Sequence, residues 1–241
     1  MATQRMSDRL RRNIGRALSD WDMLADGDLV VIGVSGGIDS LVNAWALNRW
    51  REKAPIHYDL CPVFVDIMSE YDAGYVARLT DILSSLGLPL EVIPGISRSP
   101  ETGDNCYTCA RNRRTQLFQF ARMRGATKLS FGHHQDDIIE TFFLNALYSG
   151  NISTMRPRQD LFGGTLSIIR PLSYLSKEEI DELAVHIGIS PMESICPAQG
   201  DTCRKKVRSI LAHIYQQLPH ARRSLFNALG NVRTDYLLIR D

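Results

Sequence analysis

The sequence predicts an α/β protein, built on a doubly wound parallel sheet of about five strands with helical extensions at both ends. Short apolar runs of strand length recur along the chain, and segments with helical periodicity separate them. Buried strands that alternate with helices are typical of a parallel sheet covered on both faces. Apolar residues at 44% and charged residues at 23% are near globular averages, which excludes a disordered, collagenous or coiled-coil chain.

The first expected strand is the apolar run Leu29–Val34. Four further runs of strand character are residues 60–65, 90–93, 128–131 and 166–170. None approaches the roughly 18 to 20 apolar residues that span a bilayer, and the basic N-terminus lacks the apolar core of a signal peptide. We therefore expect a cytoplasmic protein with reduced thiols and no membrane segment.

Helical patterns occupy the stretches between and beyond these strands. They are expected over residues 7–20, 41–51, 74–86, 111–124, 137–148 and 205–217. One more helix begins at the capping box Ser176–Glu179, and Gly188 is placed to end it. The predicted organisation is a basic helical segment (residues 1–24), a central α/β domain (residues 25–203) and a basic helical C-terminal segment (residues 204–241).

The segment after the first strand, SGGIDS at residues 35–40, has the composition of a phosphate-binding loop. Gly36 and Gly37 allow the backbone to approach an anion, and the following helix offers free N–H groups and the positive end of its dipole. Ser35 and Ser40 add hydroxyl donors, and Asp39 is suited to hold Mg²⁺ facing phosphate oxygens. The segment matches neither a Walker loop nor a GxGxxG dinucleotide loop.

A second polar segment, GHHQDD at residues 132–137, follows the expected strand 128–131. Because the carboxyl ends of parallel strands meet at one edge of a sheet, we expect it to lie beside residues 35–40. The adjacent carboxylates of Asp136 and Asp137 suit Mg²⁺ binding or the orientation of a nucleophile. Capping of the next helix by Asp136 alone is the structural alternative.

The five cysteines do not predict a disulfide framework, because their number is odd. Cys61 falls in an apolar run and is expected to be a buried, inert thiol. Cys106 and Cys109 form a CxxC pair, which can be a redox pair, half of a zinc site or part of an iron–sulfur site. Thioredoxin-like redox chemistry is disfavoured, because the pair is not expected between a strand and a helix in the βαβ position. Either Cys196 or Cys203 can join the pair at a metal.

The order of these motifs, SGGxDS, CxxC, GHHxDD and CP…R, resembles that of the tRNA 2-thiocytidine synthetases among the PP-loop ATP pyrophosphatases. The resemblance covers most of the chain. The chain departs from the family at Ile38, where many members have Lys, and at Cys196-Pro, where the family has a second CxxC. Ile38 in place of Lys removes a positive charge that would stabilise the pyrophosphate. Another basic residue of the chain is expected to supply that charge.

The resemblance implies ATP-dependent tRNA thiolation with ATP, Mg²⁺ and a 4Fe-4S cluster. A pyrimidine C2 oxygen attacks the α-phosphate, and hydrosulfide held on an open iron then displaces AMP, most simply giving 2-thiocytidine. The implied ATP-binding residues are Ser35, Gly36, Gly37, Asp39, Ser40, Gly132 and His133. The implied catalytic residues are Asp39, Asp137 and Cys196. The implied metal ligands are Cys106, Cys109 and Cys196 for the cluster, with Cys196 favoured over Cys203, and Asp39 for Mg²⁺. A homodimer is implied, with sulfur from a cysteine desulfurase or free hydrosulfide.

The net charge of +1 conceals an uneven distribution. Residues 1–16, 104–128 and 204–223 carry +4, +5 and +6, so the rest of the chain carries −14. Two of these windows adjoin cysteine motifs, which favours contact with RNA phosphates over solvated helix faces. The candidates are Arg111, Arg113, Arg114, Arg204, Lys205 and Arg208.

Two other functions are compatible with the sequence. One is ATP-dependent amidation or sulfur transfer to a small molecule, and the other is a zinc-stapled RNA-binding module without catalysis.

Overall fold

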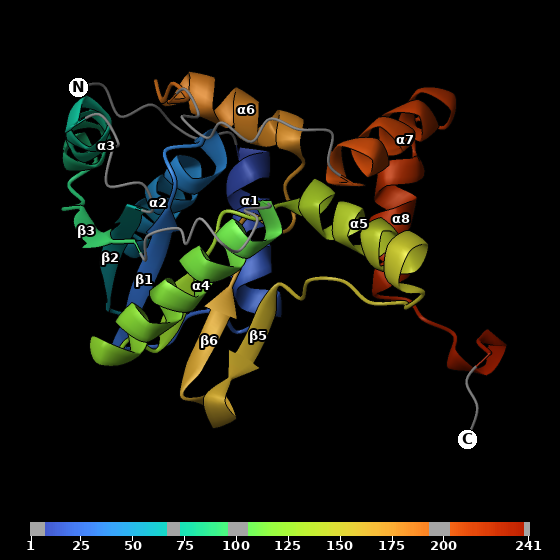
Figure 1. Ribbon diagram of the computed structural model, residues 1–241, viewed down its shortest axis with the longest axis horizontal. Helices are drawn as coiled ribbons and strands as arrows, with labels where there is room; N and C mark the ends of the chain where they lie inside the picture. The colour runs from blue at the N-terminus through green and yellow to red at the C-terminus, as the bar shows by residue number, and fades with distance from the viewer. Residues whose placement is uncertain (1–7, 67–72, 96–105, 193–202, 239–241) are drawn as a thin grey trace, which may run out of the picture. The chain divides into compact units, whose positions relative to one another are not determined.

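The computed structural model describes residues 8–66, 73–95, 106–192 and 203–238, and of residues 73 and 106–109 it describes the backbone alone. The chain divides into two compact units. The first comprises Met1–His134 and Pro157–Gln199, and the second comprises Gln135–Arg156 and Gly200–Asp241. The first unit is α/β, whereas the second is helical (Figure 1).

The first unit is built on a six-stranded sheet in the order β3-β2-β1-β4-β6-β5 (Figure 1). The strands are β1 (Asp28–Val34), β2 (Tyr58–Asp66), β3 (Glu91–Pro94), β4 (Lys128–Ser130), β5 (Arg158–Leu161) and β6 (Leu166–Ile169). Every neighbouring pair is parallel except β5 with β6. The predicted α/β class is confirmed, and β1 has the buried apolar run that a central parallel strand requires.

β5 raises the number of strands above the five that the apolar runs predict. None of its four residues is buried. It is an antiparallel edge strand joined to β6 through the 3-10 turn η3 (Phe162–Gly164). A polar edge strand is stabilised by pairing and not by a continuous apolar run, so the hydrophobic pattern could not identify it.

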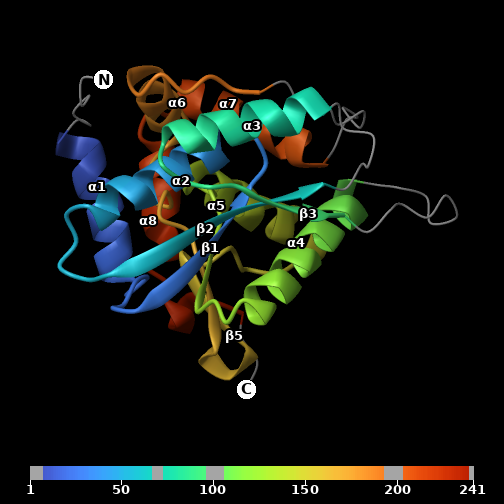
Figure 2. The ribbon, with the colours of Figure 1, turned by 90° about the vertical axis from the view of Figure 1, so that its left-hand side faces the viewer.

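Helices cover both faces of this sheet (Figure 2). The helices of one face are α1 (Asp8–Asp20), α2 (Ile38–Arg51), α3 (Ala73–Ser85) and α6 (Lys177–His186), which share one core cluster with β1 and β2. On the other face α4 (Cys106–Met123) buries Leu117, Phe120 and Ala121. These helices lie close to the predicted positions, because their apolar stripes pack against the sheet as periodicity requires.

α4 begins earlier than predicted, at Cys106 and not near residue 111, because its first turn has no apolar stripe of its own. Cys106 and Cys109 therefore form the first turn of the helix that connects β3 to β4. The position of the pair thus gives no argument against redox chemistry, contrary to the sequence-based expectation. Residues three apart share one face of a helix, so the two positions suit ligation of a common metal centre.

The second unit contains the helices α5 (Gln135–Leu144), α7 (Cys203–Gln217) and α8 (Ala221–Leu229), with the π-helical turn η2 (Asn145–Ser149) and the 3-10 turn η4 (Thr234–Tyr236). Its small core is formed by Ile139, Val207 and Leu211. α8 was not predicted, because it spans nine residues and buries none of them fully, which leaves a weak pattern. No helix in the described parts of the chain is long and apolar enough to cross a membrane.

Candidate active site

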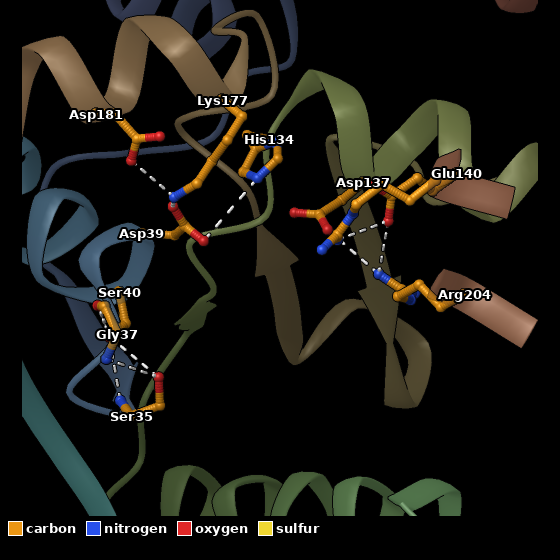
Figure 3. A network of polar contacts seen from close by, with 11 residues as sticks. Ser35, Gly37, Asp39, Ser40, His134, Asp137, Glu140, Lys177, Asp181 and Arg204 are labelled. Atoms are coloured by element: carbon orange, nitrogen blue, oxygen red, sulfur yellow. Dashed lines mark hydrogen bonds and ion pairs between the residues drawn. The ribbon is translucent and has the colours of Figure 1, made fainter. Parts of the chain in front are cut away.

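The loop between β1 and α2 is a compact turn closed by its two serines (Figure 3). Ser40 Oγ accepts a hydrogen bond from the Ser35 amide at 3.1 Å and donates to the Gly37 carbonyl at 2.8 Å. Gly37 precedes α2 with an extended backbone and provides no side-chain cap. The first amides of a helix have no intrahelical acceptor, so together with the helix dipole they suit an anion at this point.

Two glycines permit close packing around this loop. Gly36 has a φ of +81°, and a Cβ there would lie 2.1 Å from the hydroxyl of Tyr75, which itself donates to the Ser35 carbonyl. A Cβ on Gly132 would lie 2.4 Å from the carbonyl oxygen of Asp39. Gly132 therefore lets the chain leaving β4 approach the N-terminus of α2, which places it beside the loop as the parallel topology predicts.

Asp39, in the first turn of α2, is the centre of a polar network (Figure 3). Its Oδ1 accepts a hydrogen bond from Lys177 Nζ at 2.5 Å, and its Oδ2 lies 3.9 Å from His134 Nε2. Lys177 Nζ also lies 3.0 Å from Asp181 Oδ1. Burial by itself lowers the pKa of Lys177, but its hydrogen bonds to Asp39 and Asp181 outweigh burial and raise that pKa above the ordinary value. Lys177 is therefore a cation at neutral pH.

The two histidines that follow β4 differ in environment. His134 is buried, whereas His133 is half-buried and its Nδ1 accepts a hydrogen bond from Arg170 Nε at 3.3 Å. A guanidinium only donates, so this contact fixes the His133 tautomer with its proton on Nε2. Nε2 of His133 is thereby a donor that suits a phosphate oxygen.

The acidic residues of α5, in the second unit, are paired with arginines of α7 and α8. The pairs are Glu140 with Arg208 and Arg204, Asp137 with Arg204, and Asp136 with Arg222. Glu140 is 3% exposed and accepts two hydrogen bonds from Arg208, at 2.7 and 3.1 Å. Hydrogen bonding to Glu140 outweighs partial burial and raises the pKa of Arg208. These pairs join the helices of the unit to one another, and Figure 3 shows those of Arg204 with Asp137 and Glu140.

The predicted cluster ligands are only partly within the described residues. Cys106 and Cys109 are placed by the backbone of α4, and Cys196 lies outside the described residues. Cys203 is the first residue of α7 and is an exposed, free thiol. Cys61 on β2 is half-buried and not fully buried as expected, and burial raises its pKa, so it remains protonated at neutral pH.

The basic residues predicted to contact RNA fall into three groups. Arg111, Arg114 and Lys205 are exposed. The two arginines of α7 pair with the carboxylates of α5, as described above. Arg113 is only partly exposed, and its Nε is buried with no hydrogen-bond partner in the described part of the chain. Arg111, Arg114 and Lys205 are therefore the best placed of the candidates to meet a polyanion, because Arg208, although exposed, is paired with Glu140.

Three residues of this region were not identified as functional from the sequence: Lys177, Arg170 and Tyr75. The sequence does give a signal for Lys177, because a cation at the first position of a helix opposes the helix dipole. Arg170 lies 37 positions from His133 in the sequence, so no local pattern indicates that their side chains meet. Tyr75 belongs to α3 and reaches the loop through the fold alone, so no local pattern could reveal it.

Comparison with known proteins places this geometry in a family. The family model described as a PP-loop domain matches residues 6–214. The tRNA-cytidine(32) 2-sulfurtransferase of Anaeromyxobacter sp. (strain Fw109-5) is 35% identical to this chain, over 98% of this chain and 80% of its own length. The chain belongs to this PP-loop family. The resemblance inferred from the four motifs is thereby confirmed.

Two further proteins extend the comparison. The tRNA-cytidine(32) 2-sulfurtransferase of Mannheimia succiniciproducens is 34% identical over 97% of this PP-loop chain and 76% of its own length. The U34-tRNA thiolase NcsA from Methanococcus maripaludis, solved with its 4Fe-4S cluster, matches with a TM-score of 0.77 at 21% identity, covering 95% of this chain and 78% of its own. This structural likeness shows that the two proteins share the PP-loop α/β fold.

Proposed function

We propose that this PP-loop protein is an ATP-dependent tRNA sulfurtransferase that converts a cytidine of tRNA into 2-thiocytidine. The observation that carries the proposal is the SGGIDS loop, closed by Ser35 and Ser40 at the start of α2, in a chain 35% identical to a tRNA-cytidine(32) 2-sulfurtransferase. The relatives favour cytidine over the small-molecule substrates considered above. A cysteine desulfurase or free hydrosulfide is the proposed sulfur source, and the homodimer remains a prediction.

In the first step the loop binds the phosphates of ATP. Amides at the start of α2 and the helix dipole stabilise their negative charge, and His133 donates a further hydrogen bond from Nε2. The C2 oxygen of the cytidine attacks the α-phosphorus, the bond to the bridging oxygen of the β-phosphate breaks, and pyrophosphate leaves. The cytidine must leave its base stack to reach the phosphates.

In the second step sulfur replaces oxygen at C2. Hydrosulfide attacks C2, the C2–O bond breaks, the former C2 oxygen departs with AMP, and the proton of hydrosulfide is released to solvent. No oxidant or reductant is consumed, because sulfur has the same oxidation level in hydrosulfide and in the thiocarbonyl group of the product. Both leaving groups of the reaction are phosphate anions, so the donors that bind ATP also stabilise the developing charge.

The residues present fit both inorganic groups of the proposal. Mg²⁺ is commonly held by one or two carboxylates with substrate phosphates, which suits the half-exposed Asp39. No larger cluster of metal-binding side chains occurs within the described residues. Cys106 and Cys109, which share the first turn of α4, would hold a 4Fe-4S cluster together with Cys196, which lies outside the described residues. When bound, that cluster would carry the sulfur. Asp137 is proposed as a second carboxylate for adenylation.

The proposed function is tested by mass spectrometry of tRNA nucleosides from a strain that lacks this chain. We expect 2-thiocytidine to disappear and to return on complementation with the wild type or Cys203→Ala, but not with Cys106→Ala, Cys109→Ala or Cys196→Ala. Unchanged thionucleosides in the deletion strain would contradict the function. An unchanged iron and sulfide content in purified Cys196→Ala would contradict the third ligand.

A further inference from the structure

We propose that Lys177 is the cation that binds the β- and γ-phosphates of ATP, in place of the basic residue that the SGGIDS loop lacks. The inference rests on the proposed function, since it requires ATP as the substrate. It assigns a phosphate-binding role to a residue of α6, 138 positions away from Asp39 in the sequence.

The loop cannot balance the charge of a triphosphate with its own side chains. The only charged side chain in residues 35–40 belongs to Asp39, and it is negative. A carboxylate beside a polyanion is unfavourable unless a cation lies between them. Lys177 Nζ, 2.5 Å from Asp39 Oδ1, places a positive charge at this point.

The fold holds the base of the Lys177 side chain in a fixed place. Ser176 and Glu179 form a complete capping box around the first turn of α6. One turn further, Ile180 and Leu183 are fully buried in the core cluster that includes α2. The start of α6 is therefore held in place by packing, and its Lys177 ammonium lies between the carboxylates of Asp39 and Asp181 (Figure 3).

The stability of α6 explains a lysine at this position only through its i,i+4 ion pair with Asp181, which contributes a few tenths of a kcal/mol. Lys177 is the first residue of the helix, where the dipole favours acids and opposes cations. The Lys177 and Asp39 side chains are 39% and 37% exposed, and a pair this exposed contributes only about 0–1 kcal/mol. Lys177 thus opposes the helix dipole, and its ion pair with Asp39 contributes little to the stability of the fold. A residue that breaks a local rule with little gain in stability is typical of a functional position. The same exposure leaves part of the Lys177 side chain accessible from solvent.

The arrangement allows a simple exchange of partners. When ATP binds, Lys177 exchanges the Asp39 carboxylate for a phosphate oxygen, while Asp181 continues to hold the ammonium. Asp39 then becomes available to Mg²⁺. Every charge in the network thus has a partner with and without nucleotide.

The test compares dissociation constants for ATP and AMP in the presence of Mg²⁺ and without tRNA, measured by isothermal titration calorimetry. The variants are Lys177→Ala, Lys177→Arg and, as a matched control, Lys53→Ala, which removes an exposed lysine beyond the end of α2. We expect Lys177→Ala to weaken ATP binding about tenfold to a hundredfold, as loss of a charge-assisted hydrogen bond does. Lys177→Arg and Lys53→Ala should stay within about threefold of wild type, and AMP binding should not change, since AMP lacks the contacted phosphates.

Three outcomes would count against the inference or its foundation. Equal ATP affinity in Lys177→Ala and wild type would overturn the assignment of Lys177 and leave the proposed function intact. Equal weakening of ATP and AMP would also overturn it, because that pattern indicates a loop distorted by loss of the Asp39 partner. A wild-type protein that binds no ATP would overturn the proposed function itself. If Lys177→Ala lowers the melting temperature, Lys177→Met, which keeps the stem without the charge, replaces it.

Discussion

Two helices of this chain follow a parallel strand and begin with acidic residues, but their surroundings differ. Asp39 at the start of α2 is half-exposed and lies beside Lys177 and His134. Asp136 and Glu140 near the start of α5 are buried, and each forms an ion pair with an arginine from another helix. A half-exposed carboxylate can exchange its partner for a metal ion, whereas a buried carboxylate held by arginines of other helices joins those helices together.

The comparison shows that the same local pattern has two physical roles. An acid in the first turn complements the helix dipole in either case. The two roles differ in the tertiary partner of the carboxylate. The partner of Asp39 is a lysine, and the pair is partly exposed to solvent, whereas the carboxylates of α5 are covered by arginines from neighbouring helices. Asp137, proposed to act with the nucleotide, pairs with Arg204, so its role requires that arginine to release it.

The largest expected effect is that of Asp39→Asn on ATP chemistry. Removal of this charge should lower the rate of tRNA-dependent pyrophosphate release about a thousandfold. The reason is that Mg²⁺ loses its carboxylate ligand and no longer stabilises the charge on the leaving pyrophosphate. The free energy of unfolding should change by less than about 1 kcal/mol, because the pair is exposed. A pyrophosphate assay and urea unfolding measure the two quantities. Retained turnover would show that the acid of α2 is not at the reacting phosphates.

Gly132→Ala should have the next largest effect. Its methyl group would lie 2.4 Å from the Asp39 carbonyl, so the start of α2 must shift, and we expect about a hundredfold loss of turnover. Gly230→Ala is the matched control, because the nearest atom to its Cβ is 3.8 Å away and turnover should not change. The same pyrophosphate assay compares the two variants. Full activity in Gly132→Ala would mean that the close approach of β4 and α2 is dispensable.

Glu140→Gln tests the closed region. Loss of the charge weakens two hydrogen bonds to Arg208, so the free energy of unfolding should fall by about 1 to 3 kcal/mol. ATP affinity should not change. Urea unfolding and hydrogen exchange of α7 measure the first effect and calorimetry the second. Loss of ATP affinity with unchanged stability would make Glu140 a nucleotide-binding residue and remove the distinction between the regions.

The smallest effect is expected for Arg204→Ala. The Arg204 side chain is 42% exposed, and Glu140 keeps its bonds to Arg208, so the free energy of unfolding should change by less than about 1 kcal/mol. Urea unfolding beside Glu140→Gln gives the direct comparison. A loss as large as that of Glu140→Gln would show that Arg204, and not Arg208, holds the helices of the second unit.

The sequence predicted those features that depend on local chemistry. β1 was identifiable because a central parallel strand must be continuously apolar, and the residues of the SGGIDS loop because each has its own phosphate-directed role. The cation at the first position of α6 is a sequence signal for Lys177, but its contact with Asp39 could not be predicted, because that contact depends on the docking of α6 against α2. β5 and α8 were missed for a related reason, since neither buries an apolar face of its own.

We propose that this chain inserts sulfur into a tRNA cytidine at the expense of ATP. The most direct measurement incubates the anaerobically reconstituted protein with tRNA, ATP, Mg²⁺ and sulfide, and then quantifies nucleosides by mass spectrometry. The account predicts 2-thiocytidine that depends on ATP, with AMP and pyrophosphate released in equal amounts. A reconstituted protein that binds ATP and tRNA but forms no thionucleoside would contradict it.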